Sequence, residues 1–539
     1  IIAQNMKYLI TSALPYANAP LHLGHILEII QTDVWVRHLN LKGIEAHYFC
    51  ASDTHGTPVM LKSKEENITP EELIDNIYSI HKNTFKNYNV NLANFHSTHS
   101  DENEQLTTEI FKKALDKGFV YTKKIKQLFD DKENMFLSDR FVKGNCPACG
   151  AADQYGDACE ICGSTYDALD LSDPISTLSD SKPSIKESEH YFFKLNELSD
   201  YLSSKVDELS KQSPIKHKLK EWLDGDLKDW DVSRDEPYFG FKVPGEENKY
   251  IYVWMDAPVG YLSSIKNWCD KNKHDYEKLL SDKDTKLVHF IGKDIVYFHL
   301  LFWPAMLHAA DIENIEEVFV HGFLTIEGMK MSKSRGNFIL ADQALEYANA
   351  DFYRYYLSSK LNTDISDINF SVDDFVQKIN SDLIGKYINI ASRTQNFLTK
   401  HNNSQVKQNC QNETNKYKDL YAEIVSQTND REYSKALKNI MSIADEANSY
   451  ISSMEPWNKA KDGDIDSCIE ICSEALNLFK DLTILLNPYI PNVAEDLFDL
   501  LNIEQTHYDQ LGKDCLKEIK PFKPIITRLE KSEFEGILD

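Results

Sequence analysis

The sequence has no long hydrophobic run. Its longest apolar stretch spans Ile295 to Leu307 and is interrupted by a histidine and a proline. A helix that crosses a bilayer needs about 20 apolar residues, so we expect no transmembrane segment. The N-terminus also lacks a basic segment followed by an apolar run, so we expect no signal peptide. Residues 1–5 precede Met6 and are expected to be a cloning remnant outside the fold.

Glycine and proline are sparse, at 20 and 17 of 539 residues, which excludes a collagen-like or low-complexity chain. The ten cysteines do not read as a disulfide framework, because four of them fall into two Cys-x-x-Cys pairs. That pattern favours a metal in a reducing compartment, so we expect a cytoplasmic protein. Basic residues are outnumbered 59 to 85, and the net charge of −26 argues against indiscriminate nucleic-acid binding. A local basic face is still possible, since residues 386–418 carry six basic residues against one acidic.

The alternation of strand-like and helix-like segments near the N-terminus predicts an α/β fold. Residues 7–14 and 44–51 read as strands on either side of a helix over 24–40. Ile26 and Ile30 in that helix fit one buried stripe. A strand–helix–strand unit of this kind predicts a parallel sheet.

The same rhythm returns later in the chain, after a break. A β-type segment from Tyr250 to Trp254 leads to strands 286–291 and 317–321, with a helix over 295–309 between them. We therefore predict a doubly wound parallel-sheet (Rossmann-type) domain interrupted by an insertion. An all-α bundle follows, with helices expected over 373–400, 417–427, 432–453, 465–485 and 491–501.

A histidine motif follows the first strand, in the segment from Pro15 to His25. His22 and His25 are three residues apart at a helix start, so their side chains can share one face. Gly24 lets a flat ligand approach the backbone, and a helix N-terminus is a natural phosphate site. Two imidazoles there could stabilise charge that builds on a phosphate in a transition state. By itself the motif also fits two histidines that cap and pack the helix.

A basic loop, Lys330-Met-Ser-Lys-Ser334, lies about 300 residues further on, between Gly328 and Gly336. Small residues and cations on a glycine-flanked loop suit a mobile anion clamp. Lys330 and Lys333 are compact charges that can follow a moving pyrophosphate. By itself the segment also fits an ordinary solvated loop.

Four cysteines have the spacing of a metal knuckle, Cys146-x2-Cys149-x9-Cys159-x2-Cys162. Two such pairs fit tetrahedral zinc held by four thiolates. Because four thiolates leave no open coordination position, we expect this zinc to be structural. Free cysteines or redox pairs are the alternative.

The histidine motif and the Lys-Met-Ser-Lys-Ser loop together are the signature of class I aminoacyl-tRNA synthetases. From Met6 onward the chain resembles the bacterial methionyl-tRNA synthetase family over essentially its whole length. Leu23 stands where many class I enzymes have isoleucine, which is a packing change. The resembling stretches are "SALPYANAPLHLGH", "CASDTHGTPVMLK", "DRFVKGNCPACG", "DQYGDACEICG", "YVWMDAPVGY", "HFIGKDIVYFH" and "KMSKSRGNF".

The resemblance implies two reactions without a side-chain nucleophile. Methionine and ATP give methionyl-adenylate and pyrophosphate, and methionine then passes to the terminal adenosine of initiator and elongator methionine tRNA. The protein would supply positioning and charge stabilisation, with Mg²⁺ on the phosphates. The implied catalytic residues are His22, His25, Lys330 and Lys333. The implied ATP contacts are Tyr16, His22, Gly24, His25, Glu28, Gly292, Asp294 and Lys333. Asp294 alone would also suit a helix N-cap.

The resemblance also implies a methionine pocket. Asp53 follows the second strand and is a natural partner for the substrate ammonium. An unbranched thioether needs an apolar, aromatic slot. The implied lining is Leu14, Tyr16, Trp254, Ala257, Pro258, Tyr261, Ile295, Phe298 and His299. Any one of these aromatic residues could instead belong to the core.

In the helical tail, Asn389, Arg393 and Trp457 match family residues that read the CAU anticodon. An exposed Trp457 could stack on an unpaired base, and the alternative is a tryptophan that packs the bundle. We expect a monomer. The expected domains are the two halves of the catalytic domain (6–120 and 236–325), the zinc-bearing insertion (121–235), the signature loop and stem-contact region (326–380) and the anticodon-binding domain (381–539).

Three competing interpretations are open. The first is another class I synthetase. The leucine, isoleucine and valine enzymes carry a much larger editing insertion than the roughly 120 residues found here, and cysteine enzymes use zinc in the active site, whereas the four cysteines here lie together in the insertion. A nucleotidylyltransferase would share the histidine motif but would be short and lack a helical tail. A non-catalytic tRNA-binding protein built on a synthetase is disfavoured by the intact histidine and lysine motifs.

Overall fold

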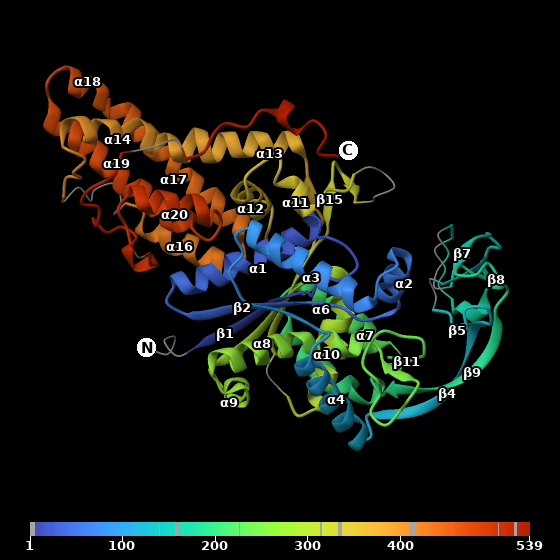
Figure 1. Ribbon diagram of the computed structural model, residues 1–539. Coiled ribbons are helices and arrows are strands. Elements are labelled where there is room, and N and C mark those ends of the chain that lie inside the picture. The colour runs from blue at the N-terminus through green and yellow to red at the C-terminus, as the bar shows by residue number, and fades with distance from the viewer. Residues whose placement is uncertain are drawn as a thin grey trace.

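The computed structural model describes residues 6–138, 141–156, 159, 161–162, 164, 166–225, 227–312, 315–331, 337–408, 416–504, 506–521 and 525–538. Figure 1 shows three parts, with an α/β body in the centre, a strand-rich insertion on one side and a helical domain on the other. Across the described part of the chain, no helix is long and apolar enough to span a membrane.

A five-stranded parallel sheet forms the centre of the body, and this confirms the predicted fold class. The strand order is β14-β13-β1-β2-β3. Because β1 lies between β2 and β13, the chain changes its winding direction at β1, and the strand ends leave a crevice there. The strands are β1 (Lys7–Ser12), β2 (Glu45–Ser52), β3 (Leu92–Ser97), β13 (Thr285–Gly292) and β14 (Ile315–His321).

Helix α1 (Leu23–Leu41) is buried on every side, so the prediction of a single buried stripe is wrong. Its polar residues Gln31, Thr32 and Asp33 are as inaccessible as its leucines. The reason is its position, because α1 packs on β1 and β2 of the sheet, on the linking helix α12 (Ala350–Ser358) and on helix α16 (Lys418–Asn429) of the helical domain. The periodicity of the helix was interpreted with the sheet as its only packing partner, so the prediction could not include the helical domain.

The other helices of the body cover both faces of the sheet (Figure 1). The prediction of a β-type segment from Tyr250 to Trp254 is wrong for the residues after Ile251, because the strand ends there. Strand β12 pairs with β11, which is three residues long, so the ladder ends there and a helical turn begins. These helices are α2 (Thr57–Glu66), α3 (Pro70–Asn87), α4 (Asp101–Asp116), α7 (Val253–Asp256), α8 (Val259–Asn272), α9 (Tyr276–Ser281), the 3₁₀ turn η5 (Lys293–Ile295), the π-helix η6 (Phe298–Phe302) and α10 (Trp303–Ala309).

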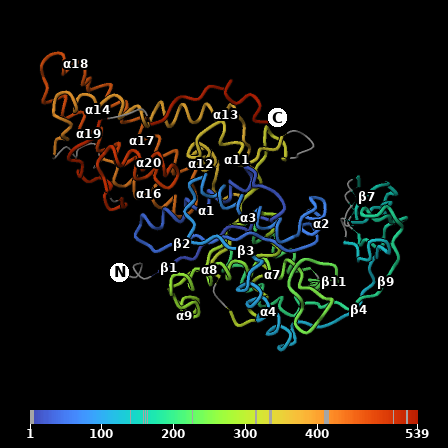
Figure 2. The backbone as a smooth tube through the Cα atoms, in the orientation of Figure 1, coloured from blue at the N-terminus to red at the C-terminus, as the bar shows by residue number. Residues whose placement is uncertain are grey.

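The insertion is carried on a long antiparallel pair, β4 with β9, which projects from the body (Figure 2). Helices α5 and α6 then return to the body, where Leu202 and Val206 pack with Val318 of β14. The elements are β4 (Val120–Asp130), β5 (Met135–Phe136), β6 (Val142–Asn145), β7 (Gln154–Tyr155), η3 (Ala168–Asp170), β8 (Ser172–Ser176), β9 (Ser184–Phe193), η4 (Asn196–Leu198), α5 (Ser199–Leu209), α6 (Ser213–Asp224), β10 (Trp230–Asp231), β11 (Ser233–Asp235) and β12 (Lys249–Ile251).

The C-terminal part is helical, as predicted, and its outermost element in Figure 1 is the short helix α18. The linking elements are β15 (Leu324–Ile326), β16 (Met329–Lys330), α11 (Ala341–Ala344), α12 (Ala350–Ser358) and β17 (Ile368–Phe370). The domain consists of α13 (Val372–Lys378), η8 (Ile379–Ile388), α14 (Asn389–His401), α16 (Lys418–Asn429), α17 (Tyr433–Met454), α18 (Pro456–Lys461), α19 (Ile465–Leu486), α20 (Pro491–Leu500), η9 (Tyr508–Gln510) and η10 (Lys531–Phe534).

A fully buried arginine joins the body to the helical domain. Arg354 on α12 donates to Asp33 Oδ2 of α1 at 2.7 Å and to the carbonyls of Pro488 and Tyr489 at 2.8 and 3.3 Å. Asp33 also accepts from Arg37 at 2.7 Å. The guanidinium therefore bonds to groups from both parts of the molecule, and removing the helical domain would take away two of its acceptors while the buried charge pair with Asp33 remains.

Candidate functional site

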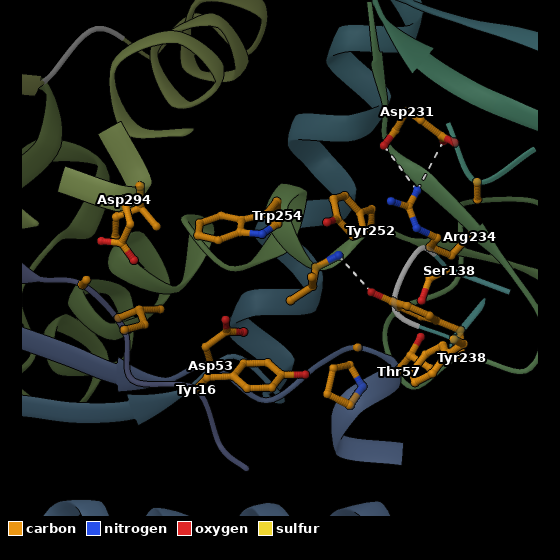
Figure 3. Close-up of a pocket in the computed structure, with 18 of the residues that line it drawn as sticks. Tyr16, Asp53, Thr57, Ser138, Asp231, Arg234, Tyr238, Tyr252, Trp254 and Asp294 are labelled. Carbon is orange, nitrogen blue, oxygen red and sulfur yellow. Dashed lines mark hydrogen bonds and ion pairs between the residues drawn. The ribbon is translucent and has the colours of Figure 1, made fainter. Parts of the chain in front are cut away.

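A cleft of about 1380 Å³ opens between the carboxyl ends of β1 and β13 and the insertion, whose lining residues include Tyr121 of β4 and Ala168 of η3. Figure 3 shows it as a row of side chains, from Asp294 at one end, past Asp53 and Trp254, to Asp231 and Arg234 at the other. The histidines of the first sequence motif, Lys330 of the second and every expected ATP contact except Lys333 line this one cavity. Half of the expected methionine pocket lines it as well, and the other half is not part of its lining: Ala257, Pro258, Tyr261, Phe298 and His299. Ligands of open parallel sheets bind in this position.

The histidine motif caps helix α1. His22 Nδ1 accepts from the backbone N–H of Gly24 at 3.0 Å, and His25 Nδ1 accepts from the backbone N–H of His22 at 3.1 Å. Since both Nδ1 atoms are acceptors, the neutral tautomer carries its proton on Nε2 in each ring. Burial and the neighbouring His22 hold the pKa of His25 well below its usual range. The two rings are stacked at a tilt, with centroids 3.8 Å apart, so the motif both caps the helix and presents paired imidazole donors.

Backbone pairing connects the histidine motif to the residues that follow the basic loop. Leu23 N–H donates to the Ile339 carbonyl at 3.1 Å, and Ala341 N–H donates to the Leu21 carbonyl at 2.8 Å. On the other side of the loop, the Met331 methyl lies so close to Gly24 that a Cβ there would be 2.8 Å away. A side chain at Gly24 would have to displace the Met331 methyl and the His22 ring.

Of the two expected cations of the loop, Lys330 is described and Lys333 lies outside the described residues. Lys330 is exposed, lines the cleft, and holds its ammonium 5.5 Å from the centre of the Phe323 ring. Asn337 donates to the Lys330 carbonyl at 3.0 Å. These contacts place the start of the loop at the mouth of the cleft.

Glu28 and His321 form a buried pair at the centre of the crevice. Glu28 accepts from the backbone N–H of Ala13 at 2.7 Å and from His321 Nε2 at 2.9 Å, while His321 Nδ1 faces the Gly322 carbonyl at 2.7 Å. Burial lowers the pKa of His321, but the hydrogen bond and charge of Glu28 outweigh it, so the pKa is raised. An acceptor at each ring nitrogen and a raised pKa both favour the doubly protonated form of His321.

The structure also places the other expected adenosine contacts at the cleft. Gly292 ends β13, and a Cβ there would lie 2.6 Å from Asp294 Oδ1. Both residues line the cleft. The N-cap of the 3₁₀ turn is Gly292, so the helix-cap alternative for Asp294 is wrong.

Asp53 lies in the middle of the cleft, with its carboxylate between Tyr16 and Trp254 (Figure 3). Tyr16 and Asp53 form a parallel bridge, and the Tyr16 hydroxyl donates to the His55 carbonyl at 2.8 Å. Burial and the nearby charge of Asp256 raise the pKa of Asp53 well above its usual range. Within the described residues, Asp53 Oδ1 is buried without a hydrogen-bond partner. A carboxylate in this environment needs a cation.

The polar end of the expected methionine pocket is a buried hydrogen bond between Tyr261 and His299. The Tyr261 hydroxyl lies 2.7 Å from His299 Nε2, and His299 Nδ1 lies 3.0 Å from the Ile295 carbonyl. The carbonyl requires a proton on Nδ1, so Nε2 accepts from the tyrosine. Burial lowers the pKa of His299 to about 4, so the imidazole is neutral.

Aromatic rings form the apolar wall of the pocket. Trp254 on α7 stacks on Phe298 of η6, with centroids 3.8 Å apart and planes 6° from parallel. A π-turn is a local irregularity that often occurs at functional sites. Leu14 packs against Gly260, where a Cβ would lie 2.6 Å from a leucine methyl. Ala257 and Pro258 join α7 to α8, and Ile295 lines the cleft.

Three features of the cleft were not predicted from the sequence. His321, Arg234 and the buried pair of His55 with Asp256 all lie in or directly behind it. Arg234 stacks on Tyr252 at 3.7 Å and contacts Asp231. The stretches "DTHG" and "YVWMDAP" contain two of these residues, but nothing in their spacing shows that His55 and Asp256 meet.

The four knuckle cysteines converge at the tip of the insertion. Their Sγ atoms all lie within 4.8 Å of one another, with Cys146 3.8 Å from Cys162 and Cys149 3.6 Å from Cys159. Backbone N–H groups point at the sulfurs, from Ala148 to Cys146 at 3.4 Å and from Cys162 to Cys159 at 3.4 Å. Amide donors around four thiols suit thiolates that hold a metal ion.

The three expected anticodon residues come together on helices α14 and α18 of the helical domain, which Figure 1 shows at the end of that domain away from the sheet. Asn389 donates to Asn448 Oδ1 at 2.8 Å, and Arg393 donates to the Asn448 carbonyl at 3.2 Å. The Arg393 guanidinium lies 5.2 Å from the centre of the Trp457 ring. Trp457 is 38% exposed, which does not fit a tryptophan buried in the bundle.

Comparison with known proteins gives matches over nearly the whole chain. Residues 8–395 match the family model of tRNA synthetases class I (M), and residues 402–528 match that of the anticodon binding domain of methionyl tRNA ligase.

Solved structures of similar fold come from Mycobacterium tuberculosis. A methionyl-tRNA synthetase in complex with methionyl-adenylate has a TM-score of 0.80 at 22% identity, covering 96% of this chain and 99% of that one. A second methionyl-adenylate complex gives 0.78 at 22%, covering 96% and 98%. The free-state enzyme gives 0.73 at 20%, covering 97% and 99%. At these identities the likeness shows a shared fold.

Proposed function

This chain belongs to the class I methionyl-tRNA synthetase family, and we propose that its cleft forms methionyl-adenylate from methionine and ATP and then transfers methionine to the 3′-terminal adenosine of methionine tRNA. One observation carries the proposal. Backbone pairing of Leu21 and Leu23 with Ile339 and Ala341 holds the histidine motif beside the basic loop at the switch point of the sheet. This arrangement brings phosphate-binding groups from both halves of the catalytic domain to one cavity.

In the first reaction, the methionine carboxylate attacks the α-phosphate of ATP and pyrophosphate leaves. We propose that the Nε2–H groups of His22 and His25 donate to phosphate oxygens in the transition state, and that Lys330 and Lys333 follow the pyrophosphate. The Nδ1 contacts support this, because they fix both tautomers. Glu28, Gly292, Asp294, Gly24 and Tyr16 would contact the nucleotide. Mg²⁺ would enter with ATP.

We propose that Asp53 pairs with the substrate ammonium and that the aromatic wall receives the thioether side chain. The unpartnered Oδ1 of Asp53 supports the first assignment. The Trp254–Phe298 stack and the Tyr261–His299 pair support the second, since they combine apolar surface with a few fixed polar atoms. Leu14, Ala257, Pro258 and Ile295 would complete the slot.

For the second reaction, we propose that Asn389, Arg393 and Trp457 read the CAU anticodon. The exposed ring with a guanidinium beside it supports this, because an unpaired base can stack on such a surface. We propose a monomer in a reducing compartment such as the cytoplasm, which fits the free thiols of the described cysteines.

We propose that Cys146, Cys149, Cys159 and Cys162 hold one structural Zn²⁺. The convergence of the four sulfurs supports the fit. The ion would hold the knuckle together and take no part in the reaction, because four thiolates complete its coordination. Elemental analysis of carefully purified protein should give one zinc per chain, and a Cys149→Ser variant should lose it; zinc-free parent protein would refute the site.

The proposed reaction is tested by ATP–PPi exchange with each amino acid in turn, followed by charging of methionine tRNA. We expect exchange that depends on methionine and on Mg²⁺. Exchange driven by another amino acid would assign a different synthetase. Charging without exchange, or neither activity in folded protein, would overturn the proposal.

A further inference from the structure

A chain of buried titratable groups lies directly behind Asp53, and the reaction described above does not use it. Asp256 on α7 is 1% exposed and bonds through Oδ2 to Nδ1 of His55, which is fully buried. His55 Nε2 lies 3.0 Å from Nδ1 of His99. His99 is exposed, so the chain runs from a buried carboxylate through a buried imidazole to solvent.

The two carboxylates at this place, Asp53 and Asp256, influence each other. The charge of Asp256 contributes to raising the pKa of Asp53, and each residue has a buried Oδ1 without a partner among the described residues. Two carboxylates this close and this dry are not both stable as unpaired anions. One of them needs a counter-charge from the protein if the other is to remain available for a substrate.

The hydrogen-bond partners of His55 suit that role. An imidazolium donates from both ring nitrogens. His55 has Asp256 Oδ2 at Nδ1 and His99 Nδ1 at Nε2, and His99 Nδ1 is an acceptor when the proton of that ring is on Nε2. His99 in turn stacks on Phe239, with centroids 5.2 Å apart, which fixes the plane of its ring. Burial and the neighbouring His55 lower the pKa of His99, which favours a neutral ring that can accept from His55.

We infer that His55, oriented by His99, neutralises Asp256 and thereby reserves the negative charge of Asp53 for the ammonium of the substrate. This inference rests on the proposed function. His55 and Asp256 are positioning residues, because they act through Asp53 and not on the reacting atoms. When methionine binds to protein whose Asp53 is protonated, that proton is released to solvent and the ammonium keeps its own three.

The other groups around the chain do not replace His55. Asp53 is faced by the hydroxyls of Tyr16 and Tyr261, whose pKa values are raised by burial and further by Asp53. These hydroxyls remain neutral at any working pH. Outside the pocket, His99 is influenced by the carboxylates of Glu71, Asp75 and Glu104, which oppose the lowering of its pKa.

The test is the pH dependence of kcat/KM for methionine, measured by ATP–PPi exchange between pH 5 and 8. The quantity compared is the acid limb of this profile, which is the pH range in which kcat/KM falls as Asp53 becomes protonated. His55→Asn removes the counter-charge of Asp256, so Asp53 and Asp256 compete for a single negative charge and the acid limb should move to higher pH by about one unit. On the acid side this is about a tenfold loss. Asp256→Asn removes the like charge, so its limb should move to lower pH. In the double variant the upward shift should disappear, because the charge that caused it is gone.

His96 provides a matched control. It is a partly buried histidine on β3 that pairs with Glu102 at 3.2 Å, outside the chain of groups behind Asp53. His96→Asn should leave the limb in place. Calorimetry of methionine binding in buffers of different ionisation enthalpy should show more proton release for His55→Asn than for the parent, and less for Asp256→Asn.

The outcomes separate this inference from the proposed function. A folded parent without methionine-dependent exchange would refute the function. An active parent whose limb is unmoved in both single variants, or moved the same way in both, would overturn the inference. A purely structural role for His55 would change KM equally at every pH and would not be reversed in the double variant. If His55→Asn does not fold, the Asp256→Asn variant alone tests the inference: a shift of its acid limb to lower pH supports it, and a shift to higher pH or no shift overturns it.

Discussion

The cleft and the tip of the helical domain hold their functional side chains in different ways. In the cleft, His22, His25 and Glu28 each bond to backbone groups, and the polar atoms behind them are buried. At the tip, Trp457 is exposed on a six-residue helix, and Arg393 reaches the backbone of α17 from α14. A site that stabilises a transition state must be rigid before the substrate arrives. A site that reads an unpaired base can offer an open stacking surface that the RNA completes.

The largest expected effect is in the cleft. Asp53→Asn should raise the KM for methionine and lower kcat, because the amide cannot pair with the buried ammonium. Losing one partner of a buried charge pair costs about 2–5 kcal/mol, or roughly 30- to several thousand-fold in kcat/KM. Steady-state exchange kinetics measure this, with thermal unfolding as the check of folding. Unchanged methionine kinetics would show that another carboxylate holds the amine.

The next effect concerns the basic loop. Lys333→Ala should slow adenylate formation by on the order of 10²-fold or more while methionine affinity stays near that of the parent. The reason is that the cation meets its charge mainly in the transition state. Single-turnover adenylation and equilibrium methionine binding separate the two quantities. Lys360→Ala, which removes an ion pair with Asp374 elsewhere, is the control. Equal adenylation rates for Lys333→Ala and the parent would remove Lys333 from the mechanism.

The tip should show a smaller effect, confined to tRNA. Trp457→Ala should leave exchange intact and lower kcat/KM for tRNA roughly tenfold to 150-fold, since stacking of a base contributes about 1–3 kcal/mol. Met454→Ala is a matched control, because this neighbour is 41% exposed but is not a stacking ring. If Trp457→Ala charges tRNA normally, or if Met454→Ala is equally impaired, the contrast between the two regions fails.

The smallest expected effect is a pH-dependent change in thermal stability, caused by the buried pair of Glu28 and His321 in the cleft. The pKa of His321 is raised by Glu28 despite burial. A raised pKa means that the pair stabilises the fold fully below the unfolded-state pKa of histidine, and that this stabilisation is lost as pH rises through the folded-state value. His321→Gln should therefore lower Tm more at pH 6 than at pH 9, by about 1–3 °C. An equal Tm difference at both pH values would show that His321 is neutral in the folded protein.

Local patterns predicted a large share of the fold. The first strand, helix and second strand, the two later strands and the main helices of the bundle lie close to the expected ranges. The signals were periodicity and turn residues, which act over short distances. Strand β3 (Leu92–Ser97) depends on its pairing with the more distant β2 and was not predicted. Helix α18 and the end of β12 at Ile251 were not predicted either.

The candidate site shows the same limit. Fixed spacing in one segment made the four cysteines and the histidine pair visible. His55 and Asp256 are 201 residues apart, and Glu28 and His321 are 293 apart, so no spacing rule could join them. The roles of the methionine-pocket and anticodon residues came from resemblance and stay predictions. Lys333 also stays a prediction, because it lies outside the described residues.

The buried Arg354 has a consequence for anyone who wishes to shorten the protein. A fragment cut at residue 395, where the catalytic family model ends, would keep Asp33 and Arg354 but lose the Pro488 and Tyr489 carbonyls. It would also expose the outer face of α1, which is buried here. The minimal methionine-activating unit is therefore not the sheet domain alone. A designer would have to supply acceptors for that guanidinium, or replace Arg354 and Asp33 together with an apolar pair, before the shorter chain could be expected to fold.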